Sequence, residues 1–277
     1  MAVKPRDEES QEMMDIGSAL SSPIVSGPKV SIITATLNSA DVLRDNLESV
    51  LSQTYENIET IVIDGGSTDG TLAILGEYDG KLSYWISEPD RGISDAMNKG
   101  IQQATGDFIL FLHSDDRFAS TGSLANAVSA VDIEKPAVWA FDVLFQTATG
   151  FKRLTPRPLN WWTNFKNPLP HQGVLCPRKL FAVLGVFDTR LKIEMDFEFW
   201  LRAYHHGVTV NRVPDILAVM RDTGISSRRD WPSLKRRFQE EKAIHARYAR
   251  NWQWSAIYRI YWPIYTTYRS IRRLAIF

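Results

Sequence analysis

The stretch VSIITATLNSADVLRDNLESVLSQTYENIETIVIDGGSTDGT (residues 30–71) decides the fold. Two continuous β-rich apolar runs, at 29–35 and 58–64, begin and continue it, and apolar residues recur at helical spacing between them, over 40–53. Short strands that are apolar throughout are typical of parallel sheets buried on both faces. The stretch therefore predicts a strand–helix–strand unit.

The same alternation continues to residue 113, with helices expected at 69–78 and 93–104 and strands at 82–87 and 107–113. This order predicts an α/β fold with a mostly parallel sheet flanked by helices. After about residue 136 the pattern changes, and 137–155 reads as two strands joined around Thr149-Gly150, an antiparallel insertion. The remaining expected elements are an aromatic loop at 161–173, a short strand at 173–178, a helix at 194–207, strands at 208–214 and 216–221, and helices at 231–250 and 254–273.

The 277 residues divide by composition into a lead-in, a main domain and a tail. Residues 1–28 carry five acids against two bases without periodicity and are expected to be disordered. The main domain is expected over 29–225. The tail, 226–277, is basic and aromatic, with twelve Lys or Arg against three acids from residue 228 onward. Such a tail predicts an anionic partner surface.

Other features concern the cell compartment. No apolar run approaches the roughly 18–20 residues of a membrane-spanning helix, and the acidic N-terminus does not resemble a secretory signal. The single cysteine, Cys176, excludes an intrachain disulfide and is expected to be a buried strand residue. We therefore expect a cytoplasmic protein.

Polar residues follow each predicted parallel strand, where ligands bind in open α/β sheets. They are Thr36 and Asn38 after the first strand, Asp64 after the second, Glu88, Asp90 and Arg91 after the third, and Ser114, Asp115 and Asp116 after the fourth. Adjacent carboxylates suit Mg²⁺ or Mn²⁺, which prefer oxygen ligands. Alternatively, Asp115 or Asp116 caps a short helix at 117–120.

Residues 30–71 together with SEPDRGISDAMNKGIQQATGDFILFLHSDD (87–116) resemble glycosyltransferase family 2, over roughly 29–220. The DGGS, SEPDRGISDAMNKG and HSDD segments resemble the branch that acts in bacterial exopolysaccharide, O-antigen and colanic-acid assembly. The resemblance implies the Rossmann-like GT-A fold, with a nucleotide-sugar half at 29–118 and an acceptor half at 119–225. It also implies a nucleotide-diphosphate sugar donor and inversion of the anomeric centre.

Carried over to this sequence, the resemblance makes Asp116 the direct metal ligand and places Asp115 beside the ribose and the metal, which would be Mn²⁺ or Mg²⁺. The implied nucleotide-sugar site comprises Thr36, Asn38, Asp64, Gly65, Arg91, Asp95 and Asp115. Gly65 replaces an acid that often reads uracil, and Leu37 replaces a base-stacking aromatic residue, so a uridine nucleotide is not specified.

In the second half, EMDFEFWLR (194–202) resembles the helix that carries the family's catalytic base, at the position of Asp196. Glu194 and Glu198, one helical turn apart, are the alternative bases, and an ordinary amphipathic helix with solvated acids is the structural alternative. The implied acceptor residues are Trp161, His171, Gln172 and Glu194. His171 could also complete the metal site or simply bond within its loop, and Trp161 and Trp162 could serve as packing.

The tail mixes arginines with Trp252, Trp254, Tyr258 and other aromatics at near-helical spacing, which suits a membrane interface. Its alternative role is packing on the domain or on a partner chain in a homo-oligomer. The resembling branch commonly uses glycans on a polyprenyl diphosphate as acceptors, so a peripheral enzyme at the inner face of the plasma membrane is expected.

The leading hypothesis is a metal-dependent inverting glycosyltransferase in surface polysaccharide biosynthesis, acting on a glycan or lipid-linked glycan. A nucleotidyltransferase would usually show a glycine-rich basic loop after the first strand, which TATLNSA (34–40) lacks. A non-catalytic nucleotide-sugar-binding protein would be expected to lack an essential acid, yet Asp115, Asp116 and Asp196 are all present. Nucleic acid is not expected, because the acidic rim would repel phosphate.

Overall fold

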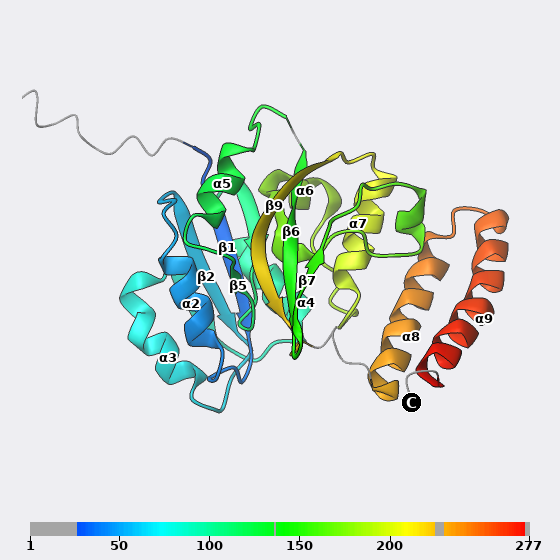
Figure 1. The fold of residues 1–277 in the computed structure, drawn as a ribbon, viewed down its shortest axis with the longest axis horizontal. Helices are drawn as coiled ribbons and strands as arrows, with labels where there is room; N and C mark the ends of the chain where they lie inside the picture. Colours follow the sequence, from blue (N-terminus) through cyan, green and yellow to red (C-terminus); the bar gives the residue numbers. More distant parts are fainter. Residues whose placement is uncertain (1–26, 136, 225–229, 275–277) are drawn as a thin grey trace, which may run out of the picture.

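The computed structural model describes residues 27–135, 137–224 and 230–274, and over 272–274 it describes the backbone. The predicted disorder of residues 1–28 therefore falls almost entirely outside the described residues. The ribbon runs from the parallel strands at one side of the molecule to a helix pair at the other (Figure 1).

The parallel part of the sheet has the order β3-β2-β1-β4. Its strands are β1 (Val30–Thr36), β2 (Ile58–Asp64), β3 (Tyr84–Ser87) and β4 (Phe108–Phe111). Since β1 pairs with β2 on one side and with β4 on the other, the chain reverses its winding direction at β1. All four predicted parallel strands are confirmed, and the carboxyl ends of β1 and β4 lie side by side, where α/β sheets bind ligands.

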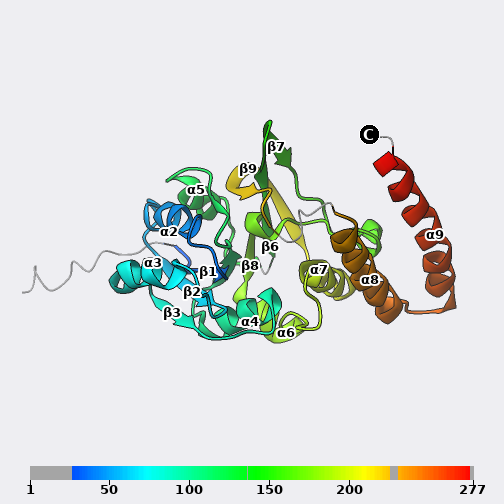
Figure 2. The same cartoon turned by 90° about the horizontal axis from the view of Figure 1, so that it is seen from below.

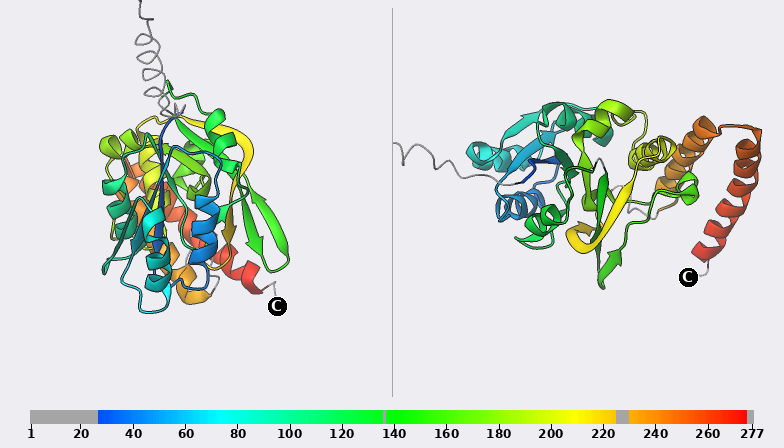
Figure 3. Two further views of the ribbon diagram at one scale, coloured as in Figure 1. Left: turned by 90° about the vertical axis from the view of Figure 1, so that its left-hand side faces the viewer. Right: turned by 90° about the horizontal axis from the view of Figure 1, so that it is seen from above.

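The sheet continues as β8-β6-β9-β5, with β7 paired to β6. These strands are β5 (Arg117–Phe118), β6 (Val138–Thr147), β7 (Gly150–Leu154), β8 (Val174–Pro177) and β9 (Val210–Arg221). The predicted antiparallel insertion is the β6–β7 hairpin, which projects from the sheet (Figure 3).

Two local expectations are wrong. The two strands expected at 208–214 and 216–221 form the single strand β9, because a register shift against β6 at Asp142 accommodates Pro214 within a continuous strand. The short helix expected as an alternative at 117–120 is absent from this described segment. Arg117 and Phe118 instead pair with β9 as β5, so neither preceding aspartate caps a helix there.

Helices cover both faces of the sheet (Figure 2). On one face lie α2 (Leu43–Leu51), α3 (Thr71–Tyr78) and α5 (Ser123–Ser129). On the other lie α4 (Ile93–Gln103), α6 (Arg178–Leu184) and α7 (Met195–His205). Short 3₁₀ turns occur at Asp79–Lys81 and, within the expected aromatic loop, at Trp161–Asn164 and His171–Gly173.

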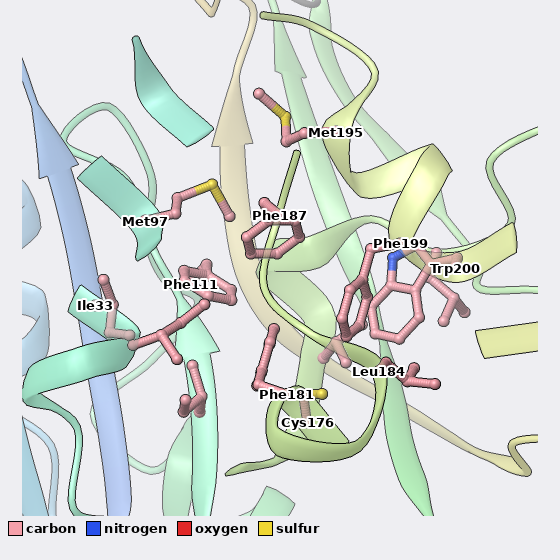
Figure 4. Close-up of a cluster of buried hydrophobic side chains, with 14 of the residues drawn as sticks. Ile33, Met97, Phe111, Cys176, Phe181, Leu184, Phe187, Met195, Phe199 and Trp200 are labelled. Atoms are coloured by element: carbon pink, nitrogen blue, oxygen red, sulfur yellow. The ribbon is translucent and has the colours of Figure 1, made fainter. Parts of the chain in front are cut away.

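An aromatic core fixes α6 and α7 to the sheet (Figure 4). Phe181 of α6 stacks on Phe199 of α7 with ring centroids 4.9 Å apart, and it meets Phe111 of β4 edge-on at 6.2 Å. Buried Cys176 of β8 belongs to the same cluster, as expected. Burial of each large side chain contributes about 1.5–3 kcal/mol, so the helix carrying Asp196 has a rigid base.

The predicted tail helices are confirmed as α8 (Trp231–Tyr248) and α9 (Trp252–Leu274). Figures 2 and 3 show α8 between α7 and α9, with α9 outermost. An aromatic cluster joins Phe165 to Phe238 of α8 and to Tyr258 and Trp262 of α9. None of the helices in the described ranges combines the length and apolarity needed to span a bilayer.

Candidate functional site

An open cleft of about 1940 Å³ lies at the carboxyl ends of the parallel strands and extends to α8 and α9. The structure brings many of the predicted site residues to its walls: Thr36, Asn38, Asp115, Asp116, His171, Gln172, Glu194 and Asp196. Other predicted residues are not part of that lining, namely Asp64, Gly65, Arg91, Asp95 and Trp161.

Asp64 lies beneath the cleft and organises the turn after β2. Its carboxylate is fully buried and accepts hydrogen bonds from the backbone N–H groups of Gly66 (3.1 Å) and Ser67 (2.9 Å) and from the hydroxyls of Ser67 and Ser87. Asn38, which follows β1, also holds this turn. Its backbone is left-handed (φ 48°), a conformation that asparagine adopts more readily than most residues. Its side-chain oxygen accepts a hydrogen bond from the Thr68 N–H at 2.9 Å. These residues shape the rim of the cleft.

The space beside Gly65 is taken by Asp90. A Cβ atom on Gly65 would lie only 2.5 Å from Asp90 Oδ2 and 3.4 Å from the exposed Leu37 side chain. Asp90 lines the cleft, and its other oxygen accepts the Gly92 N–H at 2.7 Å. The aspartate from the third strand end therefore stands where the turn after β2 has no side chain.

Arg91 and Asp95, both predicted to contact the nucleotide sugar, contact each other. The guanidinium donates to the Asp95 carboxylate at 2.9 Å, and the Arg91 side chain is 74% exposed. This ion pair lies at the start of α4, outside the cleft lining.

Asp116 is a buried carboxylate with one unused oxygen. It is 2% exposed; Oδ2 accepts bonds from Gln172 Nε2 (3.1 Å) and His113 N–H (3.3 Å), while Oδ1 has no partner among the described residues. Burial and the neighbouring Asp115 raise the pKa of Asp116 to about 7, against the smaller effects of His171 and Gln172. A carboxylate held this way is poised to gain from a cation.

Asp115 and Ser114 connect the rim to other elements. Asp115 Oδ2 accepts a bond from the Thr223 hydroxyl (2.7 Å) just beyond β9, and the Ser114 hydroxyl donates to Ser39 Oγ (2.9 Å) after β1. The HSDD segment is thereby held between both halves of the sheet.

These residues suit a hard divalent cation whose coordination shell is completed by oxygen atoms of water and of the substrate. The described residues contain no group of three or more potential ligands from His, Cys, Asp and Glu. Mg²⁺ and Mn²⁺ commonly take one or two protein carboxylates and fill the remaining positions with water and phosphate oxygens. The unpartnered Asp116 Oδ1, beside Asp115, is the oxygen best suited to that role.

Asp196 stands in the first turn of α7 and faces the cleft. Its Oδ2 accepts a bond from Asn167 Nδ2 at 2.7 Å, and Oδ1 accepts its neighbour's N–H, from Phe197, at 2.7 Å. His171 Nδ1 lies 3.5 Å from Oδ2. The carboxylate is thus oriented, and it remains partly accessible, with a side-chain exposure of 16%.

The consecutive residues His171 and Gln172 link the two carboxylates, because His171 lies against Asp196 and Gln172 bonds to Asp116. Burial lowers the pKa of His171, but the hydrogen bond to Asp196 and the charges of Asp196, Asp116 and Asp115 outweigh it and raise the pKa overall. His171 Nε2 has no partner in the described part of the chain. The neighbouring His113 is also buried, and burial keeps its pKa well below the ordinary value.

The alternative bases on the same helix are engaged in ion pairs. Glu198 is 2% exposed, bonds to Arg202 (2.9 Å) and Tyr248, and does not line the cleft. Glu194 reaches the lining but is 3% exposed and pairs with Arg237 at 2.6 Å. Neither acid is solvated, and this geometry favours Asp196 as the acid available to a ligand.

Trp161 and Trp162 form an exposed stacked pair, with ring centroids 4.3 Å apart. Trp162 lines the cleft and Trp161 supports it from outside. At the carboxyl end of α7, His205 lies 3.2 Å from the Asn164 side chain and His206 lies 2.8 Å from the Arg202 carbonyl.

Sequence reasoning missed Asn167, Lys192 and Thr223, which line the cleft. Asn167 orients Asp196 across 29 positions, Thr223 reaches Asp115 across 108, and Lys192 donates to the Arg91 carbonyl across 101. Asn167 precedes a proline and reads as a turn residue, and no local pattern distinguishes the other two. Only long-range folding identifies them.

Comparison with known proteins gives concordant results. The model of the family described as Glycosyl transferase family 2 matches residues 31–180. An uncharacterized glycosyltransferase of Mycobacterium tuberculosis is 36% identical over 233 residues, which cover 81% of this chain and 87% of the relative. A glycosyltransferase of Mycobacterium bovis, named for PGL/p-HBAD biosynthesis, is 31% identical over 191 residues, 68% of this chain and 74% of the relative.

Two solved structures share the GT-A fold. TarS 1-349 of S. aureus, in complex with UDP-GlcNAc, has a TM-score of 0.60 and 23% identity; the match covers 71% of this chain and 59% of that chain. The mannosyltransferase PcManGT of Pyrobaculum calidifontis, in complex with GDP-Man and Mn²⁺, has a TM-score of 0.61 and 20% identity, covering 87% and 72%. This chain spans 36% of the longer TarS chain.

Proposed function

The chain belongs to glycosyl transferase family 2, and from that premise we propose that it transfers a sugar from a nucleotide-diphosphate sugar to an acceptor hydroxyl, with Mn²⁺ or Mg²⁺ and with inversion at the anomeric carbon. The observation that carries this proposal is the pair of carboxylates on one cleft, Asp116 and Asp196, linked through the adjacent residues His171 and Gln172.

Asp116, with Asp115 beside it, would hold the cation. A bound cation supplies electrostatic stabilisation of the charge that develops on the leaving diphosphate. Asp64 and Asn38 shape the rim on which the nucleotide lies, and Asp90 presents its carboxylate there in place of a side chain at Gly65. Leu37 and Gly65 do not specify a base, so the donor nucleotide need not be a uridine nucleotide.

Asp196 would accept the proton of the acceptor hydroxyl as that oxygen attacks the anomeric carbon. The Asn167 amide and the Phe197 N–H hold its two oxygens at 2.7 Å, so the carboxylate is oriented before the acceptor arrives. His171 lies beside the Asp196 carboxylate, on the side of the cleft that carries Asp116, and restrains it further. Pre-oriented groups of this kind reduce the entropy lost on reaching the transition state.

The acceptor half of the cleft is cationic, which supports an acceptor that carries a phosphate or diphosphate, such as a polyprenyl-diphosphate-linked glycan in surface polysaccharide assembly. Lys152, Arg157 and Arg236 line this wall and form no ion pair with a carboxylate within the described ranges. Lys166 and Arg269 also line the cleft, each 3.1 Å from the Tyr265 hydroxyl. Planar guanidinium groups are well suited to phosphate.

A nucleotide-sugar hydrolysis screen tests the enzymatic proposal. UDP-glucose, UDP-N-acetylglucosamine and GDP-mannose are incubated with Mn²⁺ or Mg²⁺ and with wild type, Asp116→Ala, Asp196→Asn or the exposed-acid control Asp132→Asn. We expect one donor to turn over, and both site variants but not the control to lose it. The anomeric configuration of a transfer product, read by NMR, tests inversion. No turnover together with no metal-dependent nucleotide binding by calorimetry would favour the non-catalytic binding protein.

A peripheral position at the cytoplasmic face of the membrane is supported by the outer face of α9. Ile257, Ile260, Ile264, Tyr268 and Ile271 are exposed at spacings of three and four residues, which places them on one side of the helix. The double change Ile260→Ser and Ile264→Ser should reduce co-sedimentation with anionic vesicles, whereas the exposed-apolar control Val183→Ser should not. If vesicle binding is unchanged and gel filtration shows a smaller species, this face is instead a homo-oligomer contact.

A further inference from the structure

Helix α8 supplies a carboxylate to the backbone that leads into α7. Glu240 Oε1 accepts the N–H of Lys192 at 3.0 Å, and Oε2 accepts the N–H groups of Ile193 (2.9 Å) and Glu194 (3.0 Å). Three successive backbone donors thus end on one side chain that lies 46 to 48 positions away. Buried N–H groups need partners, and no residue near them in sequence provides one.

The neighbouring residues of α8 reinforce this contact. Arg237, one turn before Glu240, pairs with Glu194 at 2.6 Å and with Glu241 at 3.3 Å. Burial raises the pKa of Glu194, and the charge of Arg237 opposes that rise. If α8 moved away from the start of α7, Glu194 and Arg237 would separate and each would be left buried without its partner, which is costly. The pair therefore holds α8 at a fixed distance from the start of α7.

A second set of contacts anchors the distal part of α8. Tyr248 donates its hydroxyl to Glu198, one turn along α7, and Arg247 pairs with Asp188 at 2.8 Å in the loop before α7. The aromatic cluster of Phe165, Phe238, Tyr258 and Trp262 then fastens α9 to α8 from outside. The terminal helix pair is therefore built into the catalytic half, in contrast to an appended tail.

We propose that Glu240 is a positioning residue: it fixes the turn from Lys192 to Glu194 and so places Asp196, two residues further on, at the cleft. The inference rests on the proposed function for the role of Asp196 as base. Glu240 itself does not line the cleft. Its effect is exerted through the backbone, and a displacement of about 1 Å in a catalytic group can cost about 10²-fold in rate.

The first test is a double-mutant cycle of Glu240→Gln and Asp196→Asn on donor turnover with Mn²⁺, using the donors named above. Glu240→Gln should lower kcat about 10-fold and Glu240→Ala about 10²-fold. The KM for donor should change less, because in the described part of the chain only Lys192 of the held turn hydrogen-bonds to the nucleotide half, at the Arg91 carbonyl. In the Asp196→Asn background, Glu240→Gln should have almost no further effect, since residues that act as one unit are non-additive. The neighbouring exposed residue supplies the control, Gln239→Ala. Equal losses in both backgrounds would overturn the proposal.

The second test does not require turnover. Amide hydrogen exchange of wild type, Glu240→Gln and Gln239→Ala is compared at residues 192–197, at a temperature where thermal melts show all three folded. Faster exchange confined to this segment in Glu240→Gln supports the proposal, and unchanged exchange overturns it. If wild type turns over no donor, the proposed function fails while the exchange comparison still decides whether Glu240 holds the turn.

Discussion

Two buried acids at opposite ends of the same parallel sheet behave in opposite ways. Glu59, at the amino end of β2, is 7% exposed and fully partnered by the Lys29 ammonium, the Ser31 and Thr105 hydroxyls and nearby backbone N–H groups. Burial alone would raise the pKa of Glu59, but these hydrogen bonds lower it to about 2. This acid stabilises the fold.

Asp116, at the carboxyl end beyond β4, is more deeply buried, with 2% exposure, and keeps one oxygen without a partner within the described ranges; burial and the nearby Asp115 raise its pKa to about 7. Glu59 therefore has hydrogen-bond and ion-pair partners for its carboxylate, whereas the Asp116 carboxylate would be stabilised by an added positive charge. Acids that raise the energy of the folded state are found where a ligand supplies the missing interaction. Mutations at the two ends of the sheet should therefore have different effects, on stability at one end and on activity at the other.

The largest effect is expected for Asp116→Asn. Several kcal/mol of charge stabilisation depend on a bound cation, so donor turnover should fall by about 10³-fold. The free energy of unfolding in metal-free buffer should stay the same or rise, because an under-partnered buried carboxyl group is replaced by a neutral one. Urea denaturation and a turnover assay measure the two quantities. A large loss of stability would show that Asp116 resembles Glu59 after all.

Asp196→Asn should lower sugar transfer by about 10²- to 10⁴-fold, the usual contribution of a general base. Its carboxamide retains one oxygen to accept from Asn167 or Phe197, so folding should be little changed. Nucleotide affinity, measured by calorimetry with Mn²⁺, should match that of wild type. A parallel loss of nucleotide affinity would move Asp196 from the acceptor side to the donor side.

Glu59→Gln should reduce stability in a pH-dependent way and leave the KM for donor unchanged. The folded pKa of about 2 lies below the ordinary value of 4.5, so the ionised acid's contribution is complete above about pH 4.5 and is lost as the pH falls towards 2. The urea midpoint of wild type should exceed that of Glu59→Gln at pH 7, and the two should converge between pH 4.5 and 2. A constant difference would contradict this.

The smallest effect is expected at the tryptophan pair. Trp162→Ala should raise the KM for a sugar acceptor several-fold, about 1 kcal/mol, by removing an aromatic face from the cleft. Trp161→Ala should have a weaker effect, because that ring only supports its neighbour. Both side chains are exposed, so melting temperatures should hardly change. If Trp161→Ala has the stronger effect on KM, the acceptor binds against Trp161, outside the cleft.

The parallel half was predictable because its signals are local. Apolar strands, helical periodicity and polar strand ends placed β1 to β4 and brought Thr36, Asn38, Asp115 and Asp116 to one edge. Asp64 also follows from the sequence, since two of its partners lie within three residues. The family and the GT-A fold followed from the same motifs.

The rest depended on contacts that local sequence does not encode. Whether 208–221 formed one strand or two was decided by pairing with β6, and β5 exists only because β9 lies beside it. Arg91 and Asp95 pair with each other outside the cleft lining, a position that the sequence did not indicate. Competition among such partners depends on the assembled chain.

By itself, the sequence determined the α/β order, the acids after the strands, the base candidate on α7 and the helices of the tail. Only the tertiary structure decided which of those acids are satisfied: Glu198 by Tyr248, Glu194 by Arg237, and Asp116 by Gln172 on one oxygen alone. The physical reason is that burial and charge pairing act through space, so the state of each of these carboxylates depends on neighbours up to 56 positions away.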